Sequence, residues 1–142
     1  MRRLLPLLLA LLMLACNRTE HNSASDPAYA MLERVAELNA GGDKPGALAL
    51  ADSALLMHPA DTTRCWLLSE KAVTLVDMGR MADAVGVAQG AYRLAEKLND
   101  VDAMLNLRGT MGIAYRRLGK TDSALVQYKE GIQMALAEHN AE

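Results

Sequence analysis

The chain has 142 residues, enough for one small domain. Aromatic residues make up only 4% of it and Phe is absent, so Leu, Ala, Val and Met must build the core, and such a composition favours helices. The formal net charge is −2, which argues against general nucleic-acid binding because that activity needs a basic surface.

The N-terminal stretch MRRLLPLLLALLMLAC begins with a basic pair and continues with an almost wholly apolar run from Leu4 to Leu14. A basic start, an apolar middle and a small residue before a cleavage point are typical of a secretory signal peptide. The run is shorter than the roughly 20 apolar residues that a transmembrane helix needs. We therefore predict a cleaved signal and not a permanent membrane span. Its removal would lower the count of Lys and Arg from 15 to 13 against 17 acidic residues, a net charge of −4.

The motif MLAC at residues 13–16 resembles the lipobox of bacterial lipoproteins, although a Leu is usual where Met13 stands. The resemblance implies that a signal peptide of residues 1–15 is removed and that Cys16 carries the lipid. It also implies a lipid-anchored protein of the bacterial cell envelope. Asn17 favours the outer membrane, with the protein facing the periplasm or the cell surface. The alternative interpretation is an ordinary cleaved signal with an incidental Cys.

Residues 16–26, which start at Cys16, are small and polar and are predicted to form a flexible tether. From Asp26 on, apolar residues recur at spacings of three and four, which predicts helices. Asp26 is expected to cap the first helix, with Pro27 in its first position, and Asp43 is expected to cap the second. Breaks at residues 58–61, 79, 98–100 and 119 separate the later segments. We therefore predict six helices that pair antiparallel through short turns in an all-α fold.

One spacing pattern recurs after Gly42, Gly79 and Gly119, which lie 37 and 40 residues apart. Each glycine is followed five residues later by an alanine, and four residues after that by another small or aromatic residue. The residues in these positions are Ala47 and Ala51, Ala84 and Ala88, and Ala124 and Tyr128. A period of this length suits a helix pair with its turn, so the sequence predicts three copies of one helix hairpin.

This pattern resembles the tetratricopeptide repeat. The third copy matches the repeat best, and its matching residues are Gly112, Tyr115, Gly119, Ala124 and Tyr128. The resemblance implies an α–α superhelix, or solenoid, of three helix hairpins within residues 27–139. The copies are expected at about 28–61, 65–98 and 105–138. Such hairpins stack because none of them can bury its apolar face alone.

In this family the first helix of each pair lines a groove that receives a protein or peptide ligand. The resemblance places Tyr29, Asn39, Trp66, Asp77, Asn106, Arg116 and Arg117 in that groove. Trp66 is interpreted either as an anchor for the partner or as a filler of the junction between copies. Arg116 and Arg117 are interpreted either as a bidentate carboxylate site or as cations that complement the helix dipole.

Some family members hold a peptide carboxylate with Lys and Asn side chains in the groove. The corresponding positions here are Leu32, Ala36, Ser69, Val73, Gly109 and Ile113, so this clamp is not expected. The sequence also has no phosphate loop, dinucleotide-binding glycine motif, zinc-ligand spacing or HExxH motif. Cys65 is expected to pack as a small hydrophobic residue. We therefore expect a protein that is not an enzyme and that uses no cofactor, metal ion or small-molecule substrate.

The leading hypothesis is a lipid-anchored scaffold or adaptor of the cell envelope that binds another protein. The first alternative is the N-terminal sensory fragment of a bacterial signalling protein, either a histidine kinase or a transcriptional regulator. The second alternative is a subunit of a cell-wall hydrolase, which the absence of a reactive constellation disfavours.

Overall fold

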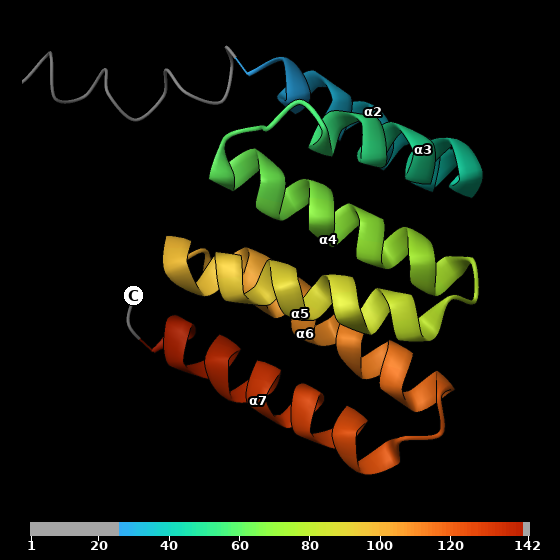
Figure 1. The fold of residues 1–142 in the computed structure, drawn as a ribbon. Coiled ribbons are helices and arrows are strands. Elements are labelled where there is room, and N and C mark those ends of the chain that lie inside the picture. The colour runs from blue at the N-terminus through green and yellow to red at the C-terminus, as the bar shows by residue number, and fades with distance from the viewer. Residues whose placement is uncertain (1–25, 141–142) are drawn as a thin grey trace, which may run out of the picture.

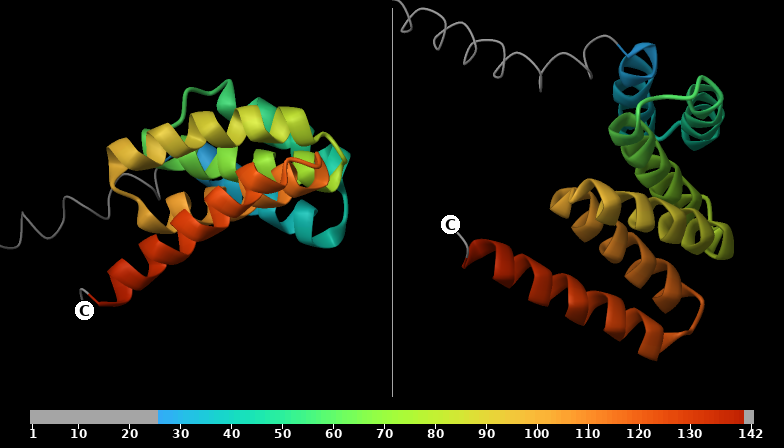
Figure 2. Two further views of the ribbon diagram at one scale, coloured as in Figure 1. Left: turned by 90° about the horizontal axis from the view of Figure 1, so that it is seen from below. Right: turned by 60° about the vertical axis from the view of Figure 1, so that its left-hand side comes forward.

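The computed structural model describes residues 26–140, and their regular structure is entirely helical. The helices, in chain order, are α2 (Pro27–Gly41), α3 (Lys44–Leu55), α4 (Asp61–Asp77), α5 (Met81–Leu98), α6 (Val101–Arg117) and α7 (Thr121–His139). They stack from α2 and α3 at one end of the molecule to α7 at the other, and the helix axes turn progressively along the stack (Figure 1, Figure 2). The predicted all-α superhelix of three hairpins is confirmed.

We number the hairpins from the N-terminus: hairpin 1 is α2 with α3, hairpin 2 is α4 with α5, and hairpin 3 is α6 with α7. Helices α4 and α6 begin four residues before the repeat copies expected at 65 and 105. The predicted signal peptide (1–15), Cys16 and the tether before Asp26 lie outside the described residues. Within the described range, no helix combines the length and the apolar character that a membrane crossing requires.

Aspartate side chains cap the first two helices. Asp26 accepts a hydrogen bond from the backbone N–H of Ala28 at 2.9 Å, and Asp43 accepts one from Gly46 at 3.0 Å. Both predicted caps are confirmed. Asp26 also accepts a bond of 3.1 Å from the N–H of Ala60, which ties the start of hairpin 1 to the entry of hairpin 2. The Ala28 bond is the main reason why the pKa of the Asp26 carboxyl is lowered.

The three turn glycines occupy equivalent bends. Gly42, Gly79 and Gly119 have φ angles of 86°, 80° and 72°, in the left-handed region that side chains with a Cβ disfavour. In each turn the glycine N–H donates to the carbonyl three residues earlier, and the next N–H donates to the carbonyl five residues earlier. This pair of bonds satisfies the last carbonyls of the helix. The chain therefore reverses in the same way inside every hairpin, as the repeat pattern predicts.

Small residues allow the helices to approach closely. The repeat alanines are all buried, namely Ala47, Ala51, Ala84, Ala88 and Ala124. Gly112 is buried in α6 and faces the ring of Tyr128 in α7. A Cβ atom at Gly112 would lie 2.3 Å from Cε1 of Tyr128, a distance that non-bonded carbon atoms do not reach. The repeat glycine at this position is therefore required by the spacing of the two helices.

The first helices of the hairpins form one continuous surface. Helix α2 contacts α4, and α4 contacts α6. Each second helix contacts the first helix of the next hairpin, whereas α3, α5 and α7 do not contact one another. We call the surface of α2, α4 and α6 the first-helix face. All residues that the sequence assigned to the groove belong to these three helices.

Candidate functional site

The predicted groove residues form two rows across the first-helix face. Helices α2, α4 and α6 run in the same direction (Figure 1). Tyr29, Trp66 and Asn106 therefore lie in a row near the helix N-termini. Asn39, Asp77 and the pair Arg116 and Arg117 lie in a row near the C-termini. The predicted residues of different hairpins therefore lie at similar positions along their helices.

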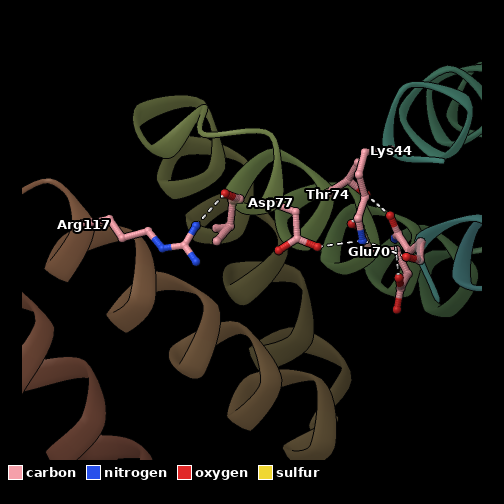
Figure 3. Close-up of polar contacts among 7 residues, drawn as sticks. Lys44, Glu70, Thr74, Asp77 and Arg117 are labelled. Atoms are coloured by element: carbon pink, nitrogen blue, oxygen red, sulfur yellow. Dashed lines mark hydrogen bonds and ion pairs between the residues drawn. The ribbon is translucent and has the colours of Figure 1, made fainter. Parts of the chain in front are cut away.

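The C-terminal row is occupied by contacts within the protein (Figure 3). Asn39 is only 8% exposed. Its side-chain N–H donates to Oε2 of Glu70 at 2.9 Å, and its Oδ1 accepts from the hydroxyl of Thr74 at 2.9 Å. Both partners belong to α4, so the Asn39 amide joins hairpin 1 to hairpin 2. The structure therefore places Asn39 in the interior and not on an accessible wall of a groove.

Lys44, the first residue of α3, forms an ion pair with Asp77 of the C-terminal row. Its ammonium group lies 2.7 Å from Oδ2 of Asp77, and it also donates to the backbone carbonyl of Asn39 at 2.7 Å. At the other side of α4, the Arg117 guanidinium donates to the backbone carbonyl of Val76 at 3.0 Å. These bonds hold the C-terminal ends of the three first helices together. Asp77 and Arg117 each keep an exposed part, but each already binds a neighbouring hairpin.

The N-terminal row contains a second set of links between hairpins. Trp66 is half-buried against the core between hairpins 2 and 3, and its indole N–H donates to Oδ2 of Asp100 at 3.1 Å. Asp100 also caps α6. The exposed Asn106 accepts a bond of 2.9 Å from the hydroxyl of the buried Ser69. Trp66 thus occupies the junction between repeat copies, the position that one of its two interpretations assigns to it.

Tyr29, Ile113 and Arg116 are accessible on the first-helix face, in addition to the exposed Asp77, Asn106 and Arg117. Tyr29 in α2 is 39% exposed and Ile113 in α6 is 36% exposed. Arg116 is exposed in the last turn of α6, where its charge also complements the helix dipole. The same helices carry two small residues, the exposed Ala36 in α2 and the half-buried Gly109 in α6. Tyr29, Ile113 and Arg116 therefore offer an aromatic ring, an aliphatic side chain and a cation on this face.

Sequence reasoning did not single out Arg108, which is the most connected side chain of hairpin 3. Its guanidinium donates to the hydroxyl of Tyr92 at 2.9 Å and to Oε1 of Gln127 at 3.0 Å, and it pairs with Glu130. It also lies over the Tyr92 ring, 4.6 Å from the centroid. Arg108 therefore joins α5, α6 and α7. The only feature of the sequence that could have drawn attention to Arg108 is its positive charge between the apolar residues Leu107 and Met111.

Two open clefts lie near these residues. One, of about 320 Å³, is lined by Gln89, Tyr92, Arg93, Arg108, Met111 and Gln127. The other, of about 410 Å³, lies at the turns of hairpins 2 and 3 and is lined by Gly79, Arg80, Met81, Ala82, Asp83, Arg117 and Leu118. Arg117 is the only predicted groove residue that lines either of them.

Cys65 has the environment of a structural residue. Its side chain is fully buried in α4, and its thiol lies 3.7 Å from the backbone carbonyl of Ala91. Burial raises the pKa of the thiol to about 11, with a smaller contribution from the charge of Asp100. The thiolate, which is the reactive form, is therefore disfavoured. Across residues 26–140, no group of three or more His, Cys, Asp or Glu side chains is arranged to hold a metal ion.

A comparison with known families identifies one match. The sequence profile described as the tetratricopeptide repeat matches residues 63–137. This range runs from the first turn of α4 into the last turns of α7 and so covers hairpins 2 and 3. Hairpin 1 lies outside the match but has the same glycine bend and the same buried alanines. Neither the curated proteins nor the solved structures contain a significant match.

Proposed function

The chain belongs to the tetratricopeptide repeat family, whose members are protein–protein interaction modules, and on that premise we propose a lipid-anchored scaffold of the bacterial cell envelope. In this proposal the first-helix face binds a protein or peptide partner, and a lipid on Cys16 holds the protein at the membrane. The outer membrane is the proposed location.

The binding role is supported mainly by the order of the first-helix face. Bonds from Asn39, Lys44 and Arg117 hold the three first helices in fixed positions. A surface that is already ordered loses little conformational entropy when a partner binds. Tyr29 and Ile113 offer apolar contact area on this ordered surface.

Arg116 sets the expected chemistry of the partner. This side chain is exposed in the last turn of α6, and its guanidinium can form two parallel hydrogen bonds with a carboxylate. We therefore expect a segment that combines apolar side chains with an acidic group. Trp66 is not part of the proposed contact surface, because its ring packs on the core and its N–H is bonded to Asp100.

Photo-crosslinking in cells that express the full chain tests the binding face. A photoreactive amino acid in place of Ile113 should yield an adduct of discrete mass with another envelope protein. The same amino acid in place of Lys97, which is exposed on the second helix α5, is the matched control and should yield none. Arg116→Glu should weaken the adduct formed at position 113, and Lys97→Glu should not. An equal adduct at position 97, or none at position 113, would refute the proposed face.

The anchor is tested separately. Cells grown with a radioactive fatty acid should label the wild-type chain and not the Cys16→Ser variant, and only the wild type should remain in the membrane fraction. Equal label in both chains would remove the lipid anchor from the proposal, while the binding face would stand.

A further inference from the structure

The cleft of about 320 Å³ between hairpins 2 and 3 is separate from the proposed binding face. Its walls come from α5, α6 and α7. None of the predicted groove residues lines it, and neither does any of the positions at which some family members hold a peptide carboxylate. We call it the hairpin 2–3 cleft.

The repeat register shows that the fold does not require polar side chains at this place. By the separations of 37 and 40 residues between the turn glycines, the lining corresponds one repeat earlier to Asp52, Leu55, Leu56, Leu68, Lys71 and Val87. Most of these are apolar, and the two charged ones, Asp52 and Lys71, pair with each other. The hairpin 2–3 cleft instead carries two arginines, two glutamines and a tyrosine beside one methionine.

Arg108 fixes the direction of two neighbouring side chains in the cleft. A guanidinium can only donate hydrogen bonds, so the atoms that face it are acceptors. The hydroxyl oxygen of Tyr92 accepts from Arg108 at 2.9 Å, and Oε1 of Gln127 accepts at 3.0 Å. The hydroxyl proton of Tyr92 and the amino group of Gln127 therefore remain available to donate, and neither has an acceptor among residues 26–140.

The cleft also carries one positive charge that no described residue balances. Glu130 pairs with Arg108 and compensates its charge. Arg93 lines the same cleft, is exposed, and takes part in none of the ion pairs among the described residues. Glu96, the nearest acidic residue along α5, is exposed and does not pair with it. Two arginines and one glutamate thus leave a charge of +1 at the cleft.

Two lining residues are not donors toward the cleft. The amide nitrogen of Gln89 donates to the hydroxyl of Tyr115 at 3.1 Å, which leaves its oxygen as an acceptor. Gln89 is exposed, so water can satisfy that oxygen. Met111 is 4% exposed and contributes an apolar part of the lining. The available groups of the cleft are therefore one free cation, two neutral donors and a small apolar surface.

We propose that the hairpin 2–3 cleft binds the carboxylate of a small organic acid. A carboxylate has two oxygens that Arg93 can hold in parallel hydrogen bonds, while Tyr92 and Gln127 supply further donors. Its single negative charge matches the single unbalanced cation, whereas a phosphate group carries about −1.5 to −2 at pH 7. The cleft volume lies at the lower end of the roughly 300–1,000 Å³ of ligand pockets, which suits a short acid whose apolar part meets Met111.

This ligand goes beyond the protein partner proposed for the first-helix face and is independent of it. It also differs from the expectation, drawn from the sequence, of no small-molecule substrate. That expectation followed from the absence of enzyme motifs, and such motifs do not report a cleft that forms only where α5, α6 and α7 meet.

Heteronuclear NMR of the isotope-labelled full chain in detergent tests the proposal, with propionate as the probe in a buffer free of carboxylate and phosphate. Titration should give saturable shifts at the side-chain N–H signals of Arg93, Arg108 and Gln127. The backbone signals of Tyr29 and Ile113 on the first-helix face should not shift. The absence of saturable shifts at the three cleft residues would overturn the proposal.

A charge-matched pair of variants separates the cleft from the overall charge of the protein. Arg93→Gln should weaken propionate binding on the order of 10-fold, because it removes a charge-assisted pair of hydrogen bonds. Lys97→Gln removes the same charge from an exposed position of α5 outside the cleft and should leave the affinity unchanged. Circular dichroism should show unchanged helix content in both variants. Equal weakening by the two substitutions would overturn the proposal.

Two further titrations test the class and the source of the ligand. Phosphate should bind more weakly than propionate, and tighter binding of phosphate would overturn the carboxylate assignment. A glutamate-containing peptide with blocked termini should also bind more weakly than propionate. Tighter binding of that peptide would overturn the small acid and assign the cleft to a side chain of another protein.

Discussion

Gly112→Ala is the most direct test of how closely the helices of hairpin 3 pack. The added Cβ would lie 2.3 Å from Cε1 of Tyr128 and 2.8 Å from its Cδ1 and Cζ. Ordinary contact between carbon atoms is about 3.5–4.0 Å, so the ring or the whole of α7 must move by more than an ångström. Overpacking of this kind costs about 1–3 kcal/mol.

The same substitution also has a favourable part. Replacing a glycine inside a helix by alanine reduces the conformational entropy lost on folding and contributes about 0.5–1 kcal/mol. The overpacking cost less the helix contribution spans about 0–2.5 kcal/mol, and from the centres of the two ranges we expect Gly112→Ala to lower the free energy of unfolding by about 1 kcal/mol.

Gly109→Ala is the matched control. Gly109 lies in the same helix, and a Cβ there would have no atom within 4 Å. Gly109→Ala reduces the conformational entropy lost on folding and introduces no clash, so this control should raise the free energy of unfolding by about 0.5–1 kcal/mol. The two variants should shift stability in opposite directions, and the gap between them measures the packing contribution of Tyr128.

Urea unfolding followed by circular dichroism at 222 nm supplies the measurement. A loss of about 1 kcal/mol corresponds to a fall in Tm of roughly 4 °C in a domain of this size. In a double-mutant cycle with Tyr128→Leu, Gly112→Ala should lose most of its cost because the ring is gone. Equal effects of Gly112→Ala and Gly109→Ala would refute the close contact between α6 and α7.

Three further predictions concern hairpins 1 and 2. Trp66→Phe should lower the free energy of unfolding, measured in urea, by about 1 kcal/mol because it removes the hydrogen bond to Asp100. Trp66→Ala should lower it by about 2–4 kcal/mol because it also removes the packing of the ring. A Trp66→Ala variant as stable as the wild type would contradict the junction role. The lowered pKa of Asp26 means that its ionised form stabilises the fold above the usual carboxyl pKa of 3.8, and that this contribution is lost as the pH falls through the lower folded value. Asp26→Asn should therefore flatten the fall of the urea midpoint below about pH 4, and an unchanged pH profile would count against the cap. In the Cys16→Ser variant, Cys65 should react slowly with a thiol reagent at pH 7 and rapidly in urea, whereas fast reaction of the native protein would contradict the burial of its thiol.

The sequence by itself determined the architecture. A glycine that must adopt positive φ and small residues at fixed offsets each specify local geometry, and this combination occurs three times, at Gly42, Gly79 and Gly119. Once the same hairpin occurs three times in succession, stacking follows because each apolar face needs a neighbour. The helices, the turns and the family could therefore be derived without coordinates.

Only the tertiary structure decided what the side chains on the first-helix face are free to do. The resemblance to the repeat family placed Asn39, Trp66 and Arg117 on that face, but it could not show that each bonds to an adjacent hairpin. Such bonds depend on the distance and rotation between α2, α4 and α6, and these are set by packing of the whole stack. For the same reason, the accessibility of Ile113 and the hairpin 2–3 cleft could be read only from the assembled fold.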